Sequence, residues 1–286
     1  MSAPSRPVLR WHGGKWKLAP WVLQHMPPHR IYVEPFGGSA SVLLQKPRAT
    51  SEIWNDLDSE VVNLFQVLRE QPDALARLLA LTPFARAEYA GLYERSEDPL
   101  ERARRFVARS FMGQNSKGAL RKSGFDTRVN ADGFSSRLRS LAAVPDEIAL
   151  VAGRMAGVLV ESADALVVIA RHDRPDCLFY VDPPYQEETC IGGVYRHGID
   201  HSELLELLRR VEGMVMLSGY PNELYDGALS DWRRVETKAF ADGARGQKGI
   251  RERREVMWLN PACAAALDVQ AGGQGTPLFQ QLEAAE

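Results

Sequence analysis

The stretch "SEIWNDLDSEVVNLFQVLRE", residues 51–70, carries a strand pattern followed at once by a helix pattern. "SEIWND" is short and bulky and ends in an acid, which is typical of a strand that leaves the core at Asp56. Beyond Ser59 the apolar residues recur at the spacing of one helix face, at Val61, Val62, Phe65 and Leu68. A strand that leads directly into a helix is the repeating unit of α/β folds.

The same unit continues on both sides of this stretch. Toward the N-terminus, "RIYVEPF" (30–36) predicts a strand, and "SASVLLQK" (39–46) predicts a helix start with Ser39 as its cap. Toward the C-terminus, further strands are predicted at "GVLVES", "CLFYVD" and "GMVMLSG", and a helix at "DHSELLELLRRVEG" (200–213). "WRRVETKAF" and "REVMWLN" close the pattern as an antiparallel hairpin. Strand–helix alternation predicts an α/β fold with a mostly parallel sheet and helices on both faces.

The alternation stops between about residues 71 and 149, where helical patterns occur without a convincing strand. Within this segment, residues 101–140 hold ten Lys and Arg against three acids, a charge of +7. The whole chain is −2, so the remainder is −9. A second basic run, "ARGQKGIRERR", lies at 244–254. This asymmetry favours a polyanionic partner, although a solvated helical face would give the same pattern.

Length and composition narrow the class of protein. The 286 residues, 45% of them hydrophobic, suit one large domain or one domain with a sizeable insertion. The apolar runs are too short to cross a bilayer, and "MSAPSRPVLRWHGGK" lacks the apolar region of a signal peptide, so we expect a cytoplasmic protein. Three cysteines without metal-type spacing predict reduced thiols and no metal. The Ala-, Gly- and Gln-rich residues 263–286 predict a loose tail.

Acids follow the predicted strands, where open parallel sheets bind their ligands. They are Glu34, Asp56, Asp164 and Asp182. After the first strand, "EPFGGSAS" provides a glycine turn that lets a ligand approach the backbone. Asp56 lies 22 residues beyond Glu34, the separation expected of an acid that binds a ribose diol. These features alone fit an NAD enzyme as well, although Gly37 and Gly38 match the dinucleotide fingerprint poorly.

The motif "DPPY", residues 182–185, indicates the chemistry. The Asp182 carboxylate and the Pro183 carbonyl are two acceptors, which suit the two hydrogens of an exocyclic amino group. Fixed proline torsions at Pro183 and Pro184 hold this geometry, and Tyr185 offers a ring for stacking. The pattern predicts a pocket for the amino group of a flipped nucleobase. The alternative is a Pro-Pro turn that only ends a strand.

The chain resembles the Dam-like, alpha-group DNA adenine methyltransferases over roughly residues 10–70 and 150–260. "RWHGGKW", "VEPFGGSAS", "WND" and "DPPY" resemble that family's motifs and occur in its order. The resemblance implies a seven-stranded Rossmann-like methyltransferase sheet with a catalytic domain at 1–70 and 150–262, and a target-recognition insertion at 71–149. It also implies S-adenosylmethionine as cofactor and double-stranded DNA as partner. The family often has a glycine where this chain has Ala40.

Carried over residue by residue, the resemblance implies a set of cofactor contacts. They are Trp11, Lys15, Glu34, Phe36, Gly38, Asp56, Asp164 and Asp182. Asp182 and Pro183 would orient the amino nitrogen of adenine for direct methyl transfer without a covalent enzyme intermediate. Basic residues would contact mainly phosphates. The candidates are Arg109, Lys117, Arg121, Lys122, Arg128, Arg137, Arg245, Lys248 and Arg251. We expect a monomer, with a dimer as the alternative.

Three other functions stay open at this stage. An RNA or other nucleobase amino-methyltransferase would use the same pocket, but "WHGGK" and the large insertion favour DNA adenine. A catalytically inactive DNA-binding relative would not need Lys15, Asp56 and Asp182 together. An NAD-linked oxidoreductase has no use for "DPPY" at a strand end.

Overall fold

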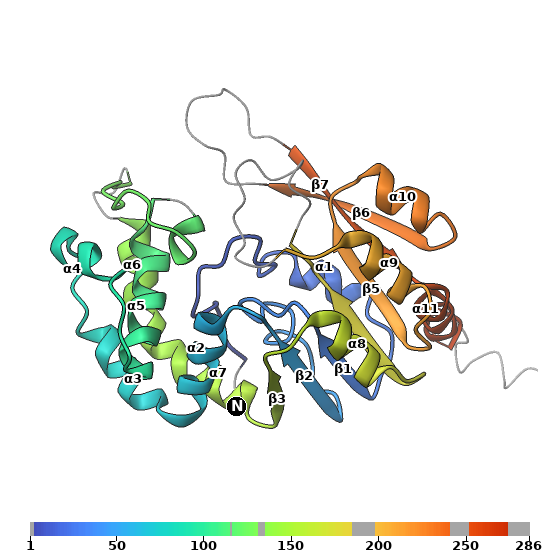
Figure 1. Ribbon diagram of the computed structural model, residues 1–286, viewed down its shortest axis with the longest axis horizontal. Helices are drawn as coiled ribbons and strands as arrows, with labels where there is room; N and C mark the ends of the chain where they lie inside the picture. Colours follow the sequence, from blue (N-terminus) through green and yellow to red (C-terminus); the bar gives the residue numbers. More distant parts are fainter. Residues whose placement is uncertain (1–2, 115, 131–134, 185–197, 241–251, 274–286) are drawn as a thin grey trace, which may run out of the picture.

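The structure is a computed structural model, and it describes residues 3–114, 116–130, 135–184, 198–240 and 252–273. Within these residues, seven strands form one sheet in the order β3-β2-β1-β4-β5-β7-β6 (Figure 1). The strands are β1 (Ile31–Glu34), β2 (Ser51–Asn55), β3 (Val158–Glu161), β4 (Cys177–Val181), β5 (Met214–Gly219), β6 (Arg233–Phe240) and β7 (Glu252–Leu259). Strands β1–β5 are parallel, and β7 is antiparallel to β5 and β6. The predicted α/β fold and its closing hairpin are confirmed.

The helices precede β1, lie between the strands and follow β7 in sequence, and most of them lie between β2 and β3. They are α1 (Ala19–Gln24), α2 (Ser59–Glu70), α3 (Pro72–Ala80), α4 (Arg86–Gly91), α5 (Pro99–Met112), the 3-10 helix η1 (Ser116–Ala119), α6 (Ser136–Ala142), α7 (Val144–Met155), α8 (Ala165–His172), α9 (His201–Leu208), α10 (Glu223–Ala228) and α11 (Pro261–Gly273). Helix α2 is capped at its N-terminus by Asp58, whose side chain accepts a hydrogen bond from the Glu60 amide. The helix predicted from the opening stretch is therefore confirmed.

Two hydrophobic layers hold the helices to the sheet. On one face, Val33, Ile53 and Phe179 pack against α8, α9 and α10, which lie together on one side of the sheet in Figure 1. On the other face, Tyr32, Trp54 and their neighbours join a larger core with α2, α3, α5 and α7. Side chains alternate between the faces along each strand, so the strands are buried on both sides and read as nearly continuous apolar runs.

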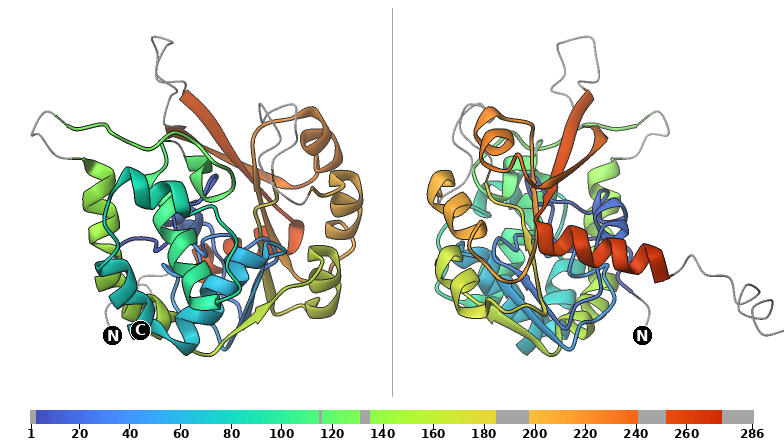
Figure 2. Two further views of the ribbon diagram at one scale, coloured as in Figure 1. Left: turned by 60° about the vertical axis from the view of Figure 1, so that its left-hand side comes forward. Right: turned by 90° about the vertical axis from the view of Figure 1, so that its right-hand side faces the viewer.

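The segment predicted to be helical contains α3, α4, α5 and α6, which form one group beside the sheet (Figure 2). Helix α7 is not among the predicted helices. It runs from Val144 to Met155 and buries Ile148 and Val151, so it crosses the predicted boundary at 149/150. Its β-branched residues and Gly153 weaken its helical pattern in the sequence. The division into a catalytic domain and a recognition insertion stays a prediction.

Two local predictions are wrong. Residues 41–46 form successive turns instead of the start of a helix. Pro47 follows directly, and proline disfavours helical backbone in the residue before it, so no second turn can add on. The loose tail predicted from residue 263 is a helix as far as Gly273. The Asn260 side chain caps it by accepting from the Cys263 amide at 2.9 Å, and its alanines are strong helix formers.

Candidate cofactor and methyl-transfer site

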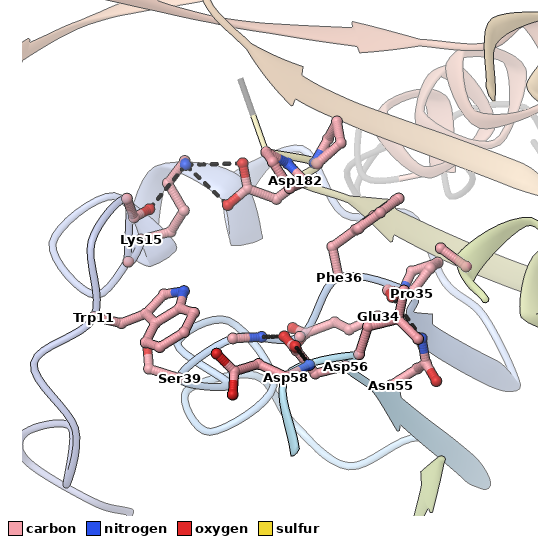
Figure 3. Close-up of a pocket in the computed structure, with 18 of the residues that line it drawn as sticks. Trp11, Lys15, Glu34, Pro35, Phe36, Ser39, Asn55, Asp56, Asp58 and Asp182 are labelled. Carbon is pink, nitrogen blue, oxygen red and sulfur yellow. Dashed lines mark hydrogen bonds and ion pairs between the residues drawn. The ribbon is translucent and has the colours of Figure 1, made fainter. Parts of the chain in front are cut away.

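A large pocket opens at the carboxyl ends of β1, β2 and β4 (Figure 3). Strand β1 has β2 on one side and β4 on the other, so the chain reverses its direction of winding at this point. Such switch points are where open α/β sheets bind ligands. The predicted cofactor-binding and catalytic residues among the described ones all line the pocket: Trp11, Lys15, Glu34, Phe36, Gly38, Asp56, Asp164, Asp182, Pro183 and Pro184. Tyr185 lies outside the described residues.

Lys15 and Asp182 form the polar centre of this pocket. The Lys15 Nζ lies 2.8 Å from each Asp182 carboxylate oxygen and 3.0 Å from the Gly13 carbonyl oxygen. Burial lowers the pKa of Lys15, but Asp182 and then Glu255 more than offset it, so the pKa stands above its ordinary value. Burial also raises the pKa of Asp182, against the opposing charge of Lys15. The two short contacts favour the ionised pair.

Asp56 holds the glycine turn against the end of β2. Its Oδ2 accepts from the Gly38 amide at 2.8 Å, and its Oδ1 accepts from the Asp58 amide at 2.8 Å. Gly38 has φ +49°, and a Cβ there would approach the Trp11 Nε1 to 2.8 Å. The backbone and the indole therefore meet at a distance that only glycine permits. This contact lines the pocket wall with backbone and a flat aromatic ring.

Ala40 has a positive φ of 54°, a conformation that L-residues other than Asn and Asp seldom adopt. This is the position where the family often has glycine. The Ala40 side chain is fully buried. The chain therefore keeps the backbone shape of the glycine turn with a residue that is strained in it, at a cost of about 1–2 kcal/mol.

Glu34 ends β1 and is 2% exposed. Its Oε1 accepts from the Tyr32 hydroxyl at 2.6 Å and from the Leu43 amide at 2.8 Å. Burial raises the pKa of Glu34 to about 7, although these hydrogen bonds favour the charged form. One carboxyl oxygen of Glu34 is thus occupied by hydrogen bonds within the fold. The carboxyl group is partly ionised near neutral pH.

The charges in the pocket favour a cationic ligand. Five carboxyl groups line it, from Glu34, Asp56, Asp58, Asp164 and Asp182, of which Glu34 is only partly ionised near neutral pH, and they face one ammonium group, from Lys15. Phe36, Leu57 and Ile199 add apolar and aromatic walls for a planar ring. A sulfonium with a ribose diol and an adenine fits this combination of acids, close backbone and flat walls. Among the described residues, no group of three or more His, Cys, Asp or Glu side chains is placed to hold a metal ion.

Some lining residues are absent from the sequence prediction. Leu57 and Asp58 follow Asp56 directly, so their position after the strand was a usable signal. Ile199 comes from the segment before α9, and Leu120 comes from the helical segment beside the sheet. Nothing in the local sequence marks Leu120, because its place depends on how that segment packs. The pocket is therefore lined both by residues at the strand ends and by a residue of the helical segment beside the sheet.

Apart from Arg109, the predicted DNA contacts fall into three groups. Arg121 and Lys122 are exposed, in the loop that follows η1. Arg128 and Arg137 form ion pairs with the buried Asp126 at one end of the same segment. The third group lies outside the part of the chain that the structure describes. It consists of the Lys117 side chain and all of Arg245, Lys248 and Arg251.

The prediction that Arg109 contacts DNA does not agree with its position. Its side chain is buried, donates to the carbonyl oxygens of Ala119 and Leu92, and lies 3.9 Å from Glu60. Other arginines of the +7 segment are partly buried in ion pairs. Arg102 pairs with Glu60, and Arg104 pairs with Glu88 and Glu101. The basic surface is therefore smaller than the sequence suggests.

Comparison with known proteins points to one family. The model of the D12 class N6 adenine-specific DNA methyltransferases matches residues 11–238. The DNA adenine methylase of Escherichia coli K12 is 30% identical over 118 residues, which cover 39% of this chain and 42% of that protein. The methylases of Serratia marcescens and Vibrio cholerae are 32% and 33% identical over 73 and 69 residues, about a quarter of each chain. The chain thus matches less than half the length of these curated relatives.

Proposed function

The chain belongs to the D12 class N6 adenine-specific DNA methyltransferase family, and we propose that it methylates the 6-amino group of adenine in double-stranded DNA. The observation that carries this proposal is the position of Asp182, Pro183 and Pro184. They border an acidic pocket at the switch point of the sheet, beside the buried Lys15. Two fixed acceptors next to a site for a cationic cofactor are what an amino-group methylation needs.

S-adenosylmethionine would supply an electrophilic methyl group on its sulfonium. Trp11, Gly38 and Phe36 would provide flat walls around it, and Asp56 would accept hydrogen bonds from its ribose. Asp164, beside the start of α8, would face its adenine. The net negative charge of the lining residues supports this assignment, because it attracts the sulfonium and repels the phosphates of DNA.

Asp182 and the Pro183 carbonyl would accept hydrogen bonds from the two N–H groups of the target amino nitrogen. The lone pair of that nitrogen is delocalised into the ring, and two acceptors favour the pyramidal form that frees it. Lys15 fixes the Asp182 carboxylate, so the acceptor is in place before the base arrives. Burial raises the pKa of Cys177 and of Cys263 to about 12, so both thiols are neutral and support direct transfer.

Arg121 and Lys122 would contact phosphates near the opening of the pocket. Leu120, which lies between η1 and Arg121 in sequence, supports that placement because it lines the pocket. Contacts of this kind position the enzyme, while sequence is read by contacts to base edges. Arg109 is left out of the proposed set because it is buried.

Labelled S-adenosylmethionine, offered with separate pools of DNA and RNA, tests the proposal. We expect label in N6-methyladenine of duplex DNA, and a loss of at least about 10²-fold in single-turnover rate for Asp182→Ala. Label in RNA, in another base, or in no product would contradict the proposal. Asp173→Ala serves as a control, since Asp173 caps the turn before β5 and lies away from the pocket.

A further inference from the structure

Residues 120–122 connect the cofactor pocket with the exposed basic residues beside it. Leu120 lines the pocket, and the next two residues, Arg121 and Lys122, are exposed. We call these three residues the tip. Because they are consecutive, the backbone on either side of the tip decides where the pocket wall and the two basic side chains lie relative to each other.

Two tyrosine hydroxyls hold the backbone on both sides of the tip. The Tyr93 hydroxyl donates to the Gly118 carbonyl oxygen at 2.8 Å, and the Tyr89 hydroxyl donates to the Ser123 carbonyl oxygen at 2.8 Å. The Ser123 amide donates to the Tyr89 oxygen at 3.3 Å. The two hydroxyl oxygens are 3.0 Å apart, and burial raises the pKa of Tyr93, so its proton stays available for the carbonyl.

The buried Arg109 joins the same two segments. Its Nε donates to the Ala119 carbonyl oxygen at 3.2 Å, next to the tip, and its Nη1 donates to the Leu92 carbonyl oxygen at 3.3 Å, next to Tyr93. Its guanidinium carbon lies 5.5 Å from the centre of the Tyr93 ring. These contacts explain why an arginine of the basic segment is only 8% exposed. We call Tyr89, Tyr93 and Arg109 the clamp.

Backbone hydrogen bonds close the loop that carries the tip. The Gln114 amide donates to the Gly124 carbonyl oxygen, and the Asp126 amide donates to the Met112 carbonyl oxygen, each at 2.8 Å. Met112 is the last residue of α5, so the loop starts and finishes beside that helix. The base of the loop and both flanks of the tip are therefore fixed relative to α5.

A fixed tip favours the binding of both ligands of the enzyme. A side chain that is already ordered before binding avoids the entropic cost of becoming ordered in the complex. Leu120 then contacts a ligand in the pocket without that cost, and Arg121 and Lys122 meet phosphates at a set distance from it. None of the clamp side chains lines the pocket as the described residues form it, so their effect on a bound ligand passes through the tip.

We propose that the clamp residues are positioning residues: they hold the tip so that Leu120 closes the pocket while Arg121 and Lys122 reach the phosphates of DNA. The proposal rests on the proposed function, because the cofactor and the duplex are the ligands that the tip serves. The helical segment thereby contributes to cofactor binding as well as to DNA binding, and the clamp touches neither ligand.

Trypsin digestion of the ligand-free protein tests the clamp itself. Trypsin cleaves after arginine and lysine, and cleavage at Arg121 and Lys122 requires local opening of the loop that carries them. Tyr93→Phe removes one hydroxyl of the clamp and should speed cleavage at these two sites about 3–10-fold, followed by mass spectrometry. Tyr225→Phe removes a different buried hydroxyl and serves as the matched control. Equal cleavage rates in Tyr93→Phe and wild type would overturn the proposal.

Ligand affinities test what the tip does. Leu120→Ala should weaken binding of S-adenosylhomocysteine and leave DNA affinity within about twofold of wild type, whereas Arg121→Gln/Lys122→Gln should do the reverse. Tyr93→Phe should weaken both affinities about 3–10-fold, because it loosens the whole tip. Titration calorimetry measures the first affinity and fluorescence anisotropy the second. A Tyr93→Phe protein that binds both ligands as wild type does would also overturn the proposal.

Combined substitutions separate positioning from a general loss of stability. If the clamp acts on the cofactor through Leu120, Tyr93→Phe should weaken S-adenosylhomocysteine binding little further once Leu120 is replaced by alanine. A general loss of stability would give additive losses, and Tyr225→Phe would show them as well. Additive losses in the Tyr93→Phe/Leu120→Ala variant therefore contradict the proposal. A wild-type protein that binds no S-adenosylhomocysteine would refute the proposed function instead, and the trypsin digest would still show whether the clamp holds the tip.

Discussion

Lys15 and Asp182 lie 167 residues apart in sequence and form an ion pair in which Nζ is 2.8 Å from both carboxylate oxygens. The Lys15 side chain is 5% exposed and that of Asp182 is 17% exposed. This pair joins the N-terminal segment to the end of β4 and closes one side of the pocket. We therefore expect loss of the pair to lower the free energy of unfolding as well as to affect catalysis.

Lys15→Met should lower the free energy of unfolding by about 2–4 kcal/mol, because it leaves a mostly buried carboxylate without its partner. The double variant Lys15→Met/Asp182→Leu should recover part of that loss, since neither charge then remains. Urea denaturation measures both. Lys17→Met removes an exposed charge two residues later and should change little. A Lys15→Met protein as stable as wild type would show that the pair is unimportant to the fold.

Glu34 should make stability depend on pH in the direction opposite to most acids. Its folded pKa of about 7 lies above the ordinary 4.5, so the folded state binds the proton more tightly. The contribution of Glu34 to stability is then greatest at low pH, falls as pH rises from about 4.5 to 7, and is level above that. Glu34→Gln keeps an acceptor for Tyr32 and Leu43, so it should raise the free energy of unfolding above pH 7 by up to about 3 kcal/mol.

Glu52, on the neighbouring strand, provides the matched contrast. Burial alone would raise its pKa, but Arg154 and Lys46 hydrogen-bond its carboxylate and leave the pKa below its usual value. Its stabilisation is present at neutral pH and is lost as pH falls through the folded pKa, so Glu52→Gln should destabilise near pH 7. Urea unfolding from pH 5 to 8.5 measures both variants. Shifts of the same sign for Glu34→Gln and Glu52→Gln would contradict the difference in their environments.

The local sequence pattern was enough to predict the sheet and many of the residues that line the pocket. Each strand–helix unit shows its period within about 20 residues, and parallel strands bring their carboxyl ends to one edge. The acids at Glu34, Asp56, Asp164 and Asp182 therefore had to converge, and they do. The turn at 41–46 escaped prediction because an apolar run of this length gives one period too few to separate a helix from a turn.

Features that depend on distant neighbours could not be predicted in this way. Arg109 looks like any other residue in a basic run, and its burial is decided by Glu60 and by the carbonyls of Leu92 and Ala119. Leu120 reaches the pocket only through the packing of the helical segment beside the sheet. Charge counts along the sequence overstate the free basic surface wherever arginines pair inside the fold.

Asp56→Ala should weaken S-adenosylmethionine binding about ten- to a hundredfold. Charge-assisted hydrogen bonds to a ribose contribute about 1.5–3 kcal/mol, and the same carboxylate holds the Gly38 and Asp58 amides in place. Asp56→Asn keeps one acceptor and should lose less. Titration calorimetry with the unreactive product S-adenosylhomocysteine measures the affinities, with the exposed Asp73→Ala as control. Unchanged affinity in a folded Asp56→Ala protein would remove Asp56 from the cofactor site.

Arg121 and Lys122 are the exposed basic side chains nearest in sequence to the pocket residue Leu120. If both contact phosphates, each releases about one counterion from duplex DNA, so the double variant Arg121→Gln/Lys122→Gln should flatten the slope of log affinity against log salt by up to about two. Arg209→Gln/Arg233→Gln removes the same charge from two exposed arginines that pair with Asp231 and Asp268 away from the pocket. Fluorescence anisotropy over a range of salt concentrations measures the slope for four proteins: wild type, each double variant, and the variant that combines all four substitutions. Equal slopes for the two double variants would mean that the effect is one of net charge, and an unchanged slope for Arg121→Gln/Lys122→Gln would mean that the loop after η1 does not meet the DNA backbone.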